Sequence, residues 1–199
     1  MASTHRLYVG TIGEGLWRST DGGQTFVRAI DGMFVECSIR ALVVDPRDPR
    51  VLYLGNEHGV YRTEDGADHW RRIDSPATGM HVWSILLSPH DPDMMFVGAC
   101  PSRLFRTDDG GRAWTEPAAR IQQGCPRIIS TRVTSLCPHP QDPNVFWAGV
   151  EIDGVQRSKD GGRTWQLVGQ GLSSQDIHAL VYVLGNPGRL IATTNNDVN

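Results

Sequence analysis

The chain has 199 residues, 39% of them hydrophobic, and is long enough to bury a core of its own without staples. Its formal net charge is −3, with 19 basic and 22 acidic residues. These charges are mixed along the chain, so there is no broad electrostatic reason to expect nucleic acid or an anionic membrane as partner. The first ten residues lack the basic segment and apolar run of a signal peptide, and no apolar stretch approaches bilayer length. We therefore expect a cytoplasmic protein.

The cysteines give no sign of a metal or redox centre. Cys37, Cys100, Cys125 and Cys137 show no C-x-x-C spacing, which argues against a zinc knuckle or a thioredoxin-type couple. We expect reduced thiols, no metal and no cofactor. A disulfide between Cys100 and Cys125 stays open, although the expected compartment disfavours it.

Short apolar runs separated by Gly, Pro and Asp predict strands from the start of the chain, without any helix. The first is RLYVG (6–10). The first complete set of four follows as SIRALVVD (38–45), VLYLGN (51–56), GVYRT (59–63) and HWRRI (69–73), with a tight turn between the third strand and the fourth.

The same pattern then returns along the chain. Second-strand sequences recur at 94–98, 145–149 and 189–193, each preceded by an Asp-Pro or Asn-Pro pair. Repeats of 40 to 50 residues with four strands each match a β-propeller blade. The sequence thus predicts an all-β propeller of four-stranded antiparallel blades, with units at approximately 1–38, 39–81, 82–130, 131–176 and, in part, 177–199.

One turn recurs in every unit, as STDGGQTF (19–26), TEDGADHW (63–70), TDDGGRAW (107–114) and SKDGGRTW (158–165). The carboxylate is expected to accept backbone N–H bonds while the glycines permit positive φ. The closing aromatic is expected to bury its ring and fix the hairpin to its blade. We assign structural roles to Asp21, Asp65, Asp109, Asp160, Phe26, Trp70, Trp114 and Trp165. The second copy has Ala67 and His69 at variant positions, so a less regular turn is expected there.

This turn resembles the Asp-box, or BNR, repeat of sialidases, xyloglucan-cleaving hydrolases, sortilin-type receptors and photosystem II assembly factor propellers. The resemblance implies a ring of about seven blades, of which four and a half are present. The remainder would then belong to a longer gene product or to another chain that completes the ring. A closed four-bladed ring, with residues 177–185 pairing beside 6–10, is the alternative. Because the repeat serves unrelated activities, the resemblance implies no single function.

Functional residues are expected at the mouth of the channel opposite the turns. Counting back from the Asp-Pro and Asn-Pro pairs places Arg40, Trp83, Arg132 and His178 at equivalent positions there. Arg40 and Arg132 are the preferred ligand contacts, because guanidinium suits bidentate capture of carboxylate or phosphate. Taken singly, Trp83 and His178 are better explained by packing.

Neighbouring loops add further candidates, and the longest repeat gains its extra length from an insertion at 119–130 that is expected on the same face. The loop candidates are Glu36, Asn56, Glu57, His58, His81, Arg103, Glu151, Asp153 and Asp176. The insertion adds Arg120, Gln122, Gln123 and Arg127 as one wall.

The sequence excludes sialidase activity, because the required arginine and tyrosine motifs are missing. The leading hypothesis is a binding or assembly module for a protein or an anionic small ligand, with carbohydrate also open as a partner. The runner-up is a glycoside hydrolase that uses two of the carboxylates among Glu36, Glu57, Glu151, Asp153 and Asp176. A gene remnant without activity is a third reading. Whether the chain is an enzyme, and whether it forms an oligomer, stays open.

Overall fold

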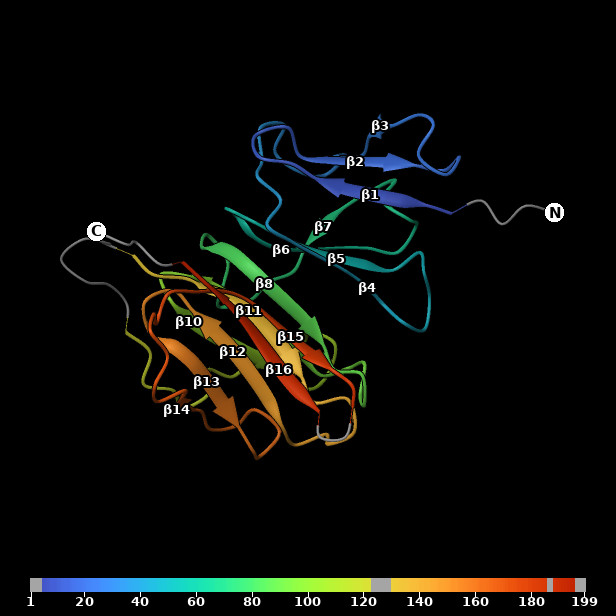
Figure 1. Ribbon diagram of the computed structural model, residues 1–199. Helices are drawn as coiled ribbons and strands as arrows, with labels where there is room; N and C mark the ends of the chain where they lie inside the picture. Colours follow the sequence, from blue (N-terminus) through green and yellow to red (C-terminus); the bar gives the residue numbers. More distant parts are fainter. Residues whose placement is uncertain (1–4, 123–129, 186–187, 196–199) are drawn as a thin grey trace.

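The computed structural model describes residues 5–122, 130–185 and 188–195, and these form sixteen strands in five antiparallel sheets (Figure 1). The first sheet contains β1 (Leu7–Gly10), β2 (Leu16–Ser19) and β3 (Val27–Arg28). The second contains β4 (Ala41–Val44), β5 (Leu52–Asn56), β6 (Gly59–Thr63) and β7 (Arg71–Arg72). The third contains β8 (His81–Leu87), β9 (Met95–Cys100) and β10 (Arg103–Thr107), and a bridge from Arg106 to Thr115 extends it outward. The fourth contains β11 (Val133–Pro138), β12 (Phe146–Val150), β13 (Gly154–Ser158) and β14 (Gln166–Val168), and the fifth contains β15 (Ile177–Val183) and β16 (Arg189–Thr194).

The sheets are successive blades of a β-propeller. Within each complete sheet the strands pair in chain order, and the innermost strands β4, β8, β11 and β15 contact one another in sequence. Figure 1 shows β8, β11 and β15 side by side. We call the five sheets the first to fifth blades. The predicted all-β propeller fold is therefore confirmed, as a partial ring.

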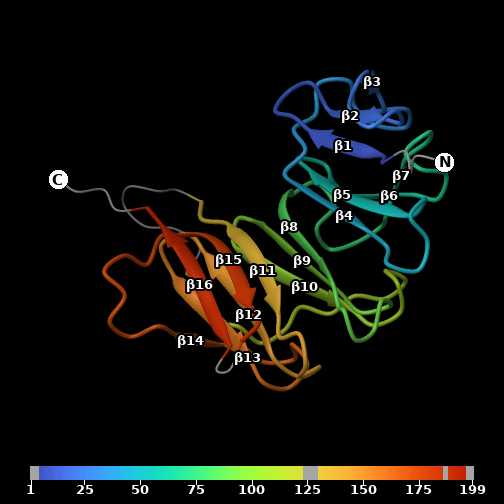
Figure 2. The same ribbon diagram turned by 45° about the vertical axis from the view of Figure 1, so that its right-hand side comes forward.

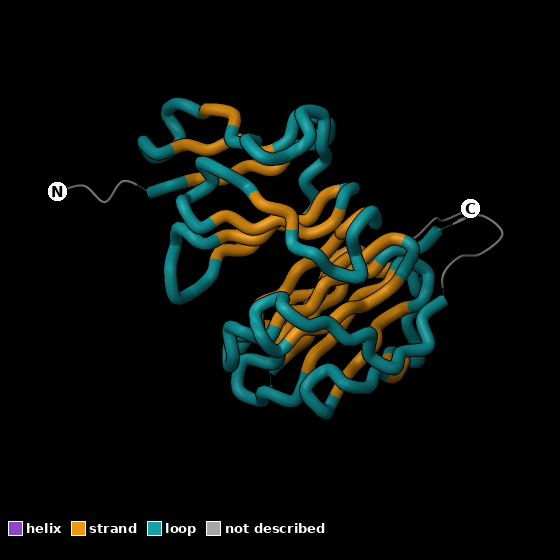
Figure 3. The backbone as a smooth tube through the Cα atoms, turned by 180° about the vertical axis from the view of Figure 1, so that it is seen from behind, coloured by secondary structure: helices purple, strands orange, loops and turns teal. Residues whose placement is uncertain are grey.

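The alternative of a closed four-bladed ring is wrong for this structure. Strand β15 pairs with β16, and β1 pairs with β2; in the described residues no pairing joins β15 to β1. Figure 2 shows the first and fifth blades at opposite ends of the molecule. Figure 3 shows strands connected only by loops, and no helix long and apolar enough to cross a membrane occurs in 5–122, 130–185 or 188–195.

A repeated glycine joins each blade to the next one. A Cβ atom on Gly98 of β9 would lie 2.6 Å from Val133 Cγ1, which belongs to the first residue of β11. The same close approach brings Gly10 to Ile39, Gly55 to Val82 and Gly149 to Ile177. The four apolar residues that enter these joints are buried, so the core is a series of clusters between neighbouring blades. Close backbone approach is a role that only glycine fulfils.

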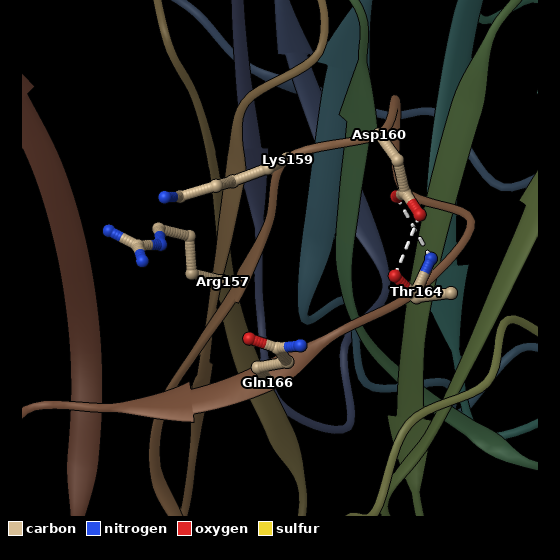
Figure 4. Close-up of a pocket in the computed structure, with 5 residues that line it drawn as sticks. All are labelled: Arg157, Lys159, Asp160, Thr164 and Gln166. Carbon is tan, nitrogen blue, oxygen red and sulfur yellow. Dashed lines mark hydrogen bonds between the residues drawn. The ribbon is translucent and has the colours of Figure 1, made fainter.

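The repeated aspartate turn is held by its own hydrogen bonds. In the fourth blade, Asp160 accepts the backbone N–H groups of Arg163 and Thr164 at 3.0 and 2.9 Å, and the Thr164 hydroxyl at 2.7 Å. Figure 4 shows the two bonds from Thr164. Burial alone would raise the pKa of Asp160, but the hydrogen bonds from Thr164 and Ser158 outweigh it and lower the pKa to about 2. The carboxylate is fully engaged in the turn.

The variant second turn keeps this geometry, so the expectation of a less regular turn is wrong. Asp65 still accepts the N–H groups of Asp68 and His69, and Ala67 adopts the left-handed φ of 73° that glycine holds in the other copies. His69 lacks the hydroxyl found in two other copies, and its Nδ1 lies 2.9 Å from Asp31 instead.

The closing aromatics pack against the preceding blade, not only against their own. Trp70 is 1% exposed and donates its indole N–H to Ala29 of the first blade, and Trp165 lies edge-on to Phe96 of the third. Trp114 is half-buried. Phe26 departs from the prediction because the described residues place no blade in front of the first one, and its side chain stays 39% exposed.

Three cysteines, Cys37, Cys100 and Cys137, are free thiols, and burial raises the pKa of each. Cys125 lies outside the described residues.

Candidate binding site

Two sets of hydrogen bonds show which loops meet at each end of the blades. At one end, the loops that enter inner strands meet the loops between second and third strands: the backbone N–H of Ser38 donates to the carboxylate of Glu57 at 2.9 Å. At the other end, the aspartate turns of the second, third and fourth blades each donate a glycine N–H to the Asp-Pro loop of their own blade, as Gly110 does to the Asp93 carbonyl at 2.9 Å. The end that the sequence predicts as the channel mouth is therefore the end opposite the turns, and we call it the mouth.

Three predicted residues come together at this mouth. The guanidinium carbon of Arg40 lies 4.4 Å from the Trp83 ring centroid, and that of Arg132 lies at the same distance. The residues come from three consecutive blades, with Trp83 on the middle one. Cation–π contacts of this kind orient a guanidinium without consuming its hydrogen-bond donors. We call Arg40, Trp83 and Arg132 the tryptophan stack.

Arg132 reaches the stack from a position that differs from the predicted one. Residues Ala41, Ser84, Ser135 and Ala179 pair with equivalent second-strand residues, so the residues before them are Arg40, Trp83, Thr134 and His178. Arg132 lies two residues earlier than the equivalent position, because the Asp-Pro pair of the fourth blade is ten residues after Arg132 and eight after Thr134. The predicted equivalence is wrong for Arg132, although the residue joins the group.

Arg132 also forms an ion pair with the buried carboxylate of Glu151; the sequence names both residues as candidates but does not predict that they pair. Its Nε lies 3.0 Å from Glu151 Oε2, and the Glu151 side chain is 8% exposed against 33% for Arg132. Burial raises the pKa of Glu151, Arg132 lowers it, and the neighbouring charge of Asp176 raises it again. The backbone brings the two residues together, because the Glu151 N–H donates to the Arg132 carbonyl at 3.0 Å.

Among the described residues, Arg40 is the cation of the stack whose guanidinium N–H groups are free to bind a ligand. Its side chain is exposed, and it makes no ion pair with any residue in 5–122, 130–185 or 188–195. The indole Nε1 of Trp83 is excluded from solvent and lacks a hydrogen-bond partner among the same residues. An unsatisfied buried donor beside a free guanidinium is the kind of exception that needs a functional explanation.

The remaining candidates are engaged elsewhere or lie apart from the stack. Arg103 pairs with Glu116 at 2.8 Å and lies over Phe105 in its own blade. His81 is exposed at the start of β8. Glu57 is bound to the Ser38 N–H group, and His178 Nε2 lies 3.3 Å from Asp176.

The insertion reaches this end as expected, since the Gln122 N–H donates to Asp153 at 3.0 Å. Arg127 lies outside the described residues. Within the part of the chain that the structure describes, no group of three or more His, Cys, Asp or Glu residues is placed to hold a metal.

Blades radiating from an axis, with inner strands that contact one another in chain order, define this protein as a β-propeller. The family model described as "Sortilin, neurotensin receptor 3" matches residues 14–146. The chain belongs to this sortilin-Vps10 family.

Similar proteins include enzymes and a peptide-binding protein. A probable oligoxyloglucan-reducing end-specific xyloglucanase of Neosartorya fischeri is 28% identical over 50% of this chain and 13% of its own length. Xyloglucanase Xgh74A of Acetivibrio thermocellus is 24% identical over 76% of this chain and 16% of its own length. The chain thus spans less than a fifth of these relatives.

Solved structures show the same fold. The crystal structure of an ancestral GH74 enzyme superposes with a TM-score of 0.71 at 18% identity, over 93% of this chain and 25% of that one. YCF48 bound to D1 peptide superposes with a TM-score of 0.64 at 19% identity, over 97% of this chain and 58% of that one.

Proposed function

We propose that this protein is a binding module that captures a protein segment or a small anionic ligand at the channel mouth, through the tryptophan stack. The observation that carries the proposal is the exposed Arg40 guanidinium, held at 4.4 Å on the Trp83 ring and left without a carboxylate partner among the described residues. An oriented guanidinium binds a carboxylate or phosphate bidentately. We also propose that the four aspartate turns are Asp-boxes that hold the blades and take no part in binding.

Relatives support a binding role without fixing its ligand. One similar structure holds a D1 peptide, and the curated relatives act on xyloglucan. Both kinds of partner are large enough to cover the stack. A partner with an anionic group matches the exposed Arg40 guanidinium.

Intrinsic tryptophan fluorescence tests the proposal. Titration with a panel of di- and tricarboxylates and acidic peptides is expected to change the Trp83 signal, and Arg40→Gln is expected to remove the change. Arg189→Gln is the matched control, because Arg189 is an exposed arginine at the other end of the fifth blade. If Arg40→Gln responds to every ligand as the parent does, the stack is not the binding site.

A glycoside hydrolase is the second candidate, and Glu151 is the observation in its favour. A carboxyl whose pKa is raised by burial, with a second carboxyl on Asp176 near enough to raise it further, has the character of a general acid beside a base. Release of reducing sugar from xyloglucan oligosaccharides, abolished by both Glu151→Gln and Asp176→Asn, would support it. Unchanged xyloglucan after prolonged incubation would count against it.

A further inference from the structure

An arginine occupies the same place in each of the first four blades, directly before the Ser or Thr of the aspartate turn. These residues are Arg18, Arg62, Arg106 and Arg157. In the first blade, Arg18 crosses to the second: its Nη1 lies 2.6 Å from the Gly66 carbonyl and 2.7 Å from Asp68. The first junction is therefore closed by an ion pair between blades.

At the junction between the second and third blades, a basic residue replaces the acidic residue that closes the first junction. The turn position that holds Asp68 in the second blade holds Arg112 in the third. Arg62 pairs instead with Glu64 of its own blade. Arg71 lies opposite Arg62 in the β6–β7 pairing, so these two side chains share the face toward the third blade.

These arginines line a groove of about 620 Å³ at the aspartate-turn end of the blades. Five guanidinium groups border it, from Arg47, Arg62, Arg71, Arg72 and Arg112. This volume falls in the range of small-molecule sites, about 300–1,000 Å³.

The three carboxylates of the groove neutralise its five cations only in part. Asp93 pairs with Arg47 at 2.7 Å. Asp109 accepts the N–H groups of Arg112 and Ala113 within its own turn, which lowers its pKa. Asp74 is the third acidic residue at the groove.

Three of the guanidinium groups are left without partners. In the described residues, the side chains of Arg71, Arg72 and Arg112 make no hydrogen bond or ion pair. Facing like charges destabilise the protein unless an anion lies between them.

We propose that this groove binds a multiply charged ligand that carries tetrahedral oxyanion groups, a phosphate or a multiply sulfated sugar, between Arg71 of the second blade and Arg112 of the third. Guanidinium forks match tetrahedral oxyanions, and an anion of charge −2 or more replaces the carboxylate that closes the first junction. The site is at the opposite end of the blades from the tryptophan stack and is independent of it.

Isothermal titration calorimetry at constant ionic strength tests the site, with inorganic pyrophosphate and a disaccharide bearing two or more sulfate esters as probes. Saturable binding is expected, and Arg112→Asp is expected to weaken it about tenfold or more, since removing one charge-assisted hydrogen bond has that order of effect. Arg112→Asp reproduces the acidic residue of the second blade, so the groove closes through Arg62 and the melting temperature stays equal or rises. Arg163→Gln is the control, because Arg163 holds the same turn position in the fourth blade and lies outside the groove.

The two probes distinguish the sources of the oxyanion. Binding of pyrophosphate alone supports a phosphate ligand, and binding of the disaccharide alone supports a sulfate ester. Absence of saturable binding by either probe, or equal affinity in the parent and in Arg112→Asp, would overturn the proposal. If Arg112→Asp does not fold, Arg71→Gln provides the same comparison.

Discussion

Replacing Arg132 with Gln is expected to destabilise the protein in a pH-dependent way. Arg132 is the cation at 3.0 Å from Glu151, whose side chain is 8% exposed. Breaking a fully buried pair costs about 3–5 kcal/mol. Because the Arg132 side chain is 33% exposed, solvent screens the pair. We therefore expect the substitution to lower the free energy of unfolding by about 1–3 kcal/mol at pH 8. Removing the cation–π interaction with Trp83 adds about 0.5–1 kcal/mol that does not depend on pH.

The sign of the pH dependence follows from the pKa of Glu151. Burial already holds this pKa above its ordinary value of 4.5, and Arg132 lowers it, so the substitution raises it further. A carboxyl whose pKa is higher in the folded state than in the unfolded state stabilises the folded protein at pH values below the unfolded-state pKa. This stabilisation is lost as pH rises through the folded-state pKa. The deficit of Arg132→Gln is therefore small near pH 4.5 and grows toward pH 8.

Urea denaturation at intervals between pH 4.5 and 8 measures this deficit. The double variant Arg132→Gln, Glu151→Gln is expected to recover part of the loss at pH 8, because it removes the unpaired carboxylate. A deficit of the same size at every pH would refute the reasoning, since it would mean that Glu151 is not the group left uncompensated.

Three further predictions concern the blades. Gly98→Ala is expected to cost about 1–3 kcal/mol in urea denaturation, because the new Cβ would lie 2.6 Å from Val133 Cγ1; a neutral result would contradict the close joint between blades. Thr164→Ala is expected to cost about 0.5–1 kcal/mol, since it removes the 2.7 Å bond to Asp160, and Thr164→Ser should retain most of it. The pKa of Asp160 is lowered to about 2, so the stability that its ionised form contributes is present above pH 4 and lost as pH falls toward 2; circular dichroism during acid titration should show a smaller loss in Asp160→Asn.

Much of the fold could be predicted because its signals are local. The aspartate turn depends on hydrogen bonds within eight residues, and the strands of the second blade begin and end close to the predicted limits. The tryptophan stack was predicted in part, since Arg40 and Trp83 occupy equivalent places in neighbouring blades. Arg132 joins them from a position two residues before the equivalent one, and its long side chain extends to Trp83 of the neighbouring blade. Its ion pair with Glu151 joins residues that the sequence separates by a loop and two strands, and no local pattern reports it.

The arginine before each turn has a different kind of partner in different blades. That partner decides whether an ion pair closes the junction between two blades. Arg18 takes a carboxylate from the next blade, while Arg106 takes Asp108 of its own blade at 2.5 Å. In the second blade Arg62 also pairs within its blade, and Arg112 then faces it across the groove. At this position of the following turn, Asp68 thus belongs to a joint closed by an ion pair, and Arg112 belongs to a cationic groove. Departures from the repeat, more than the repeat itself, are therefore where the chemistry of this propeller is expected.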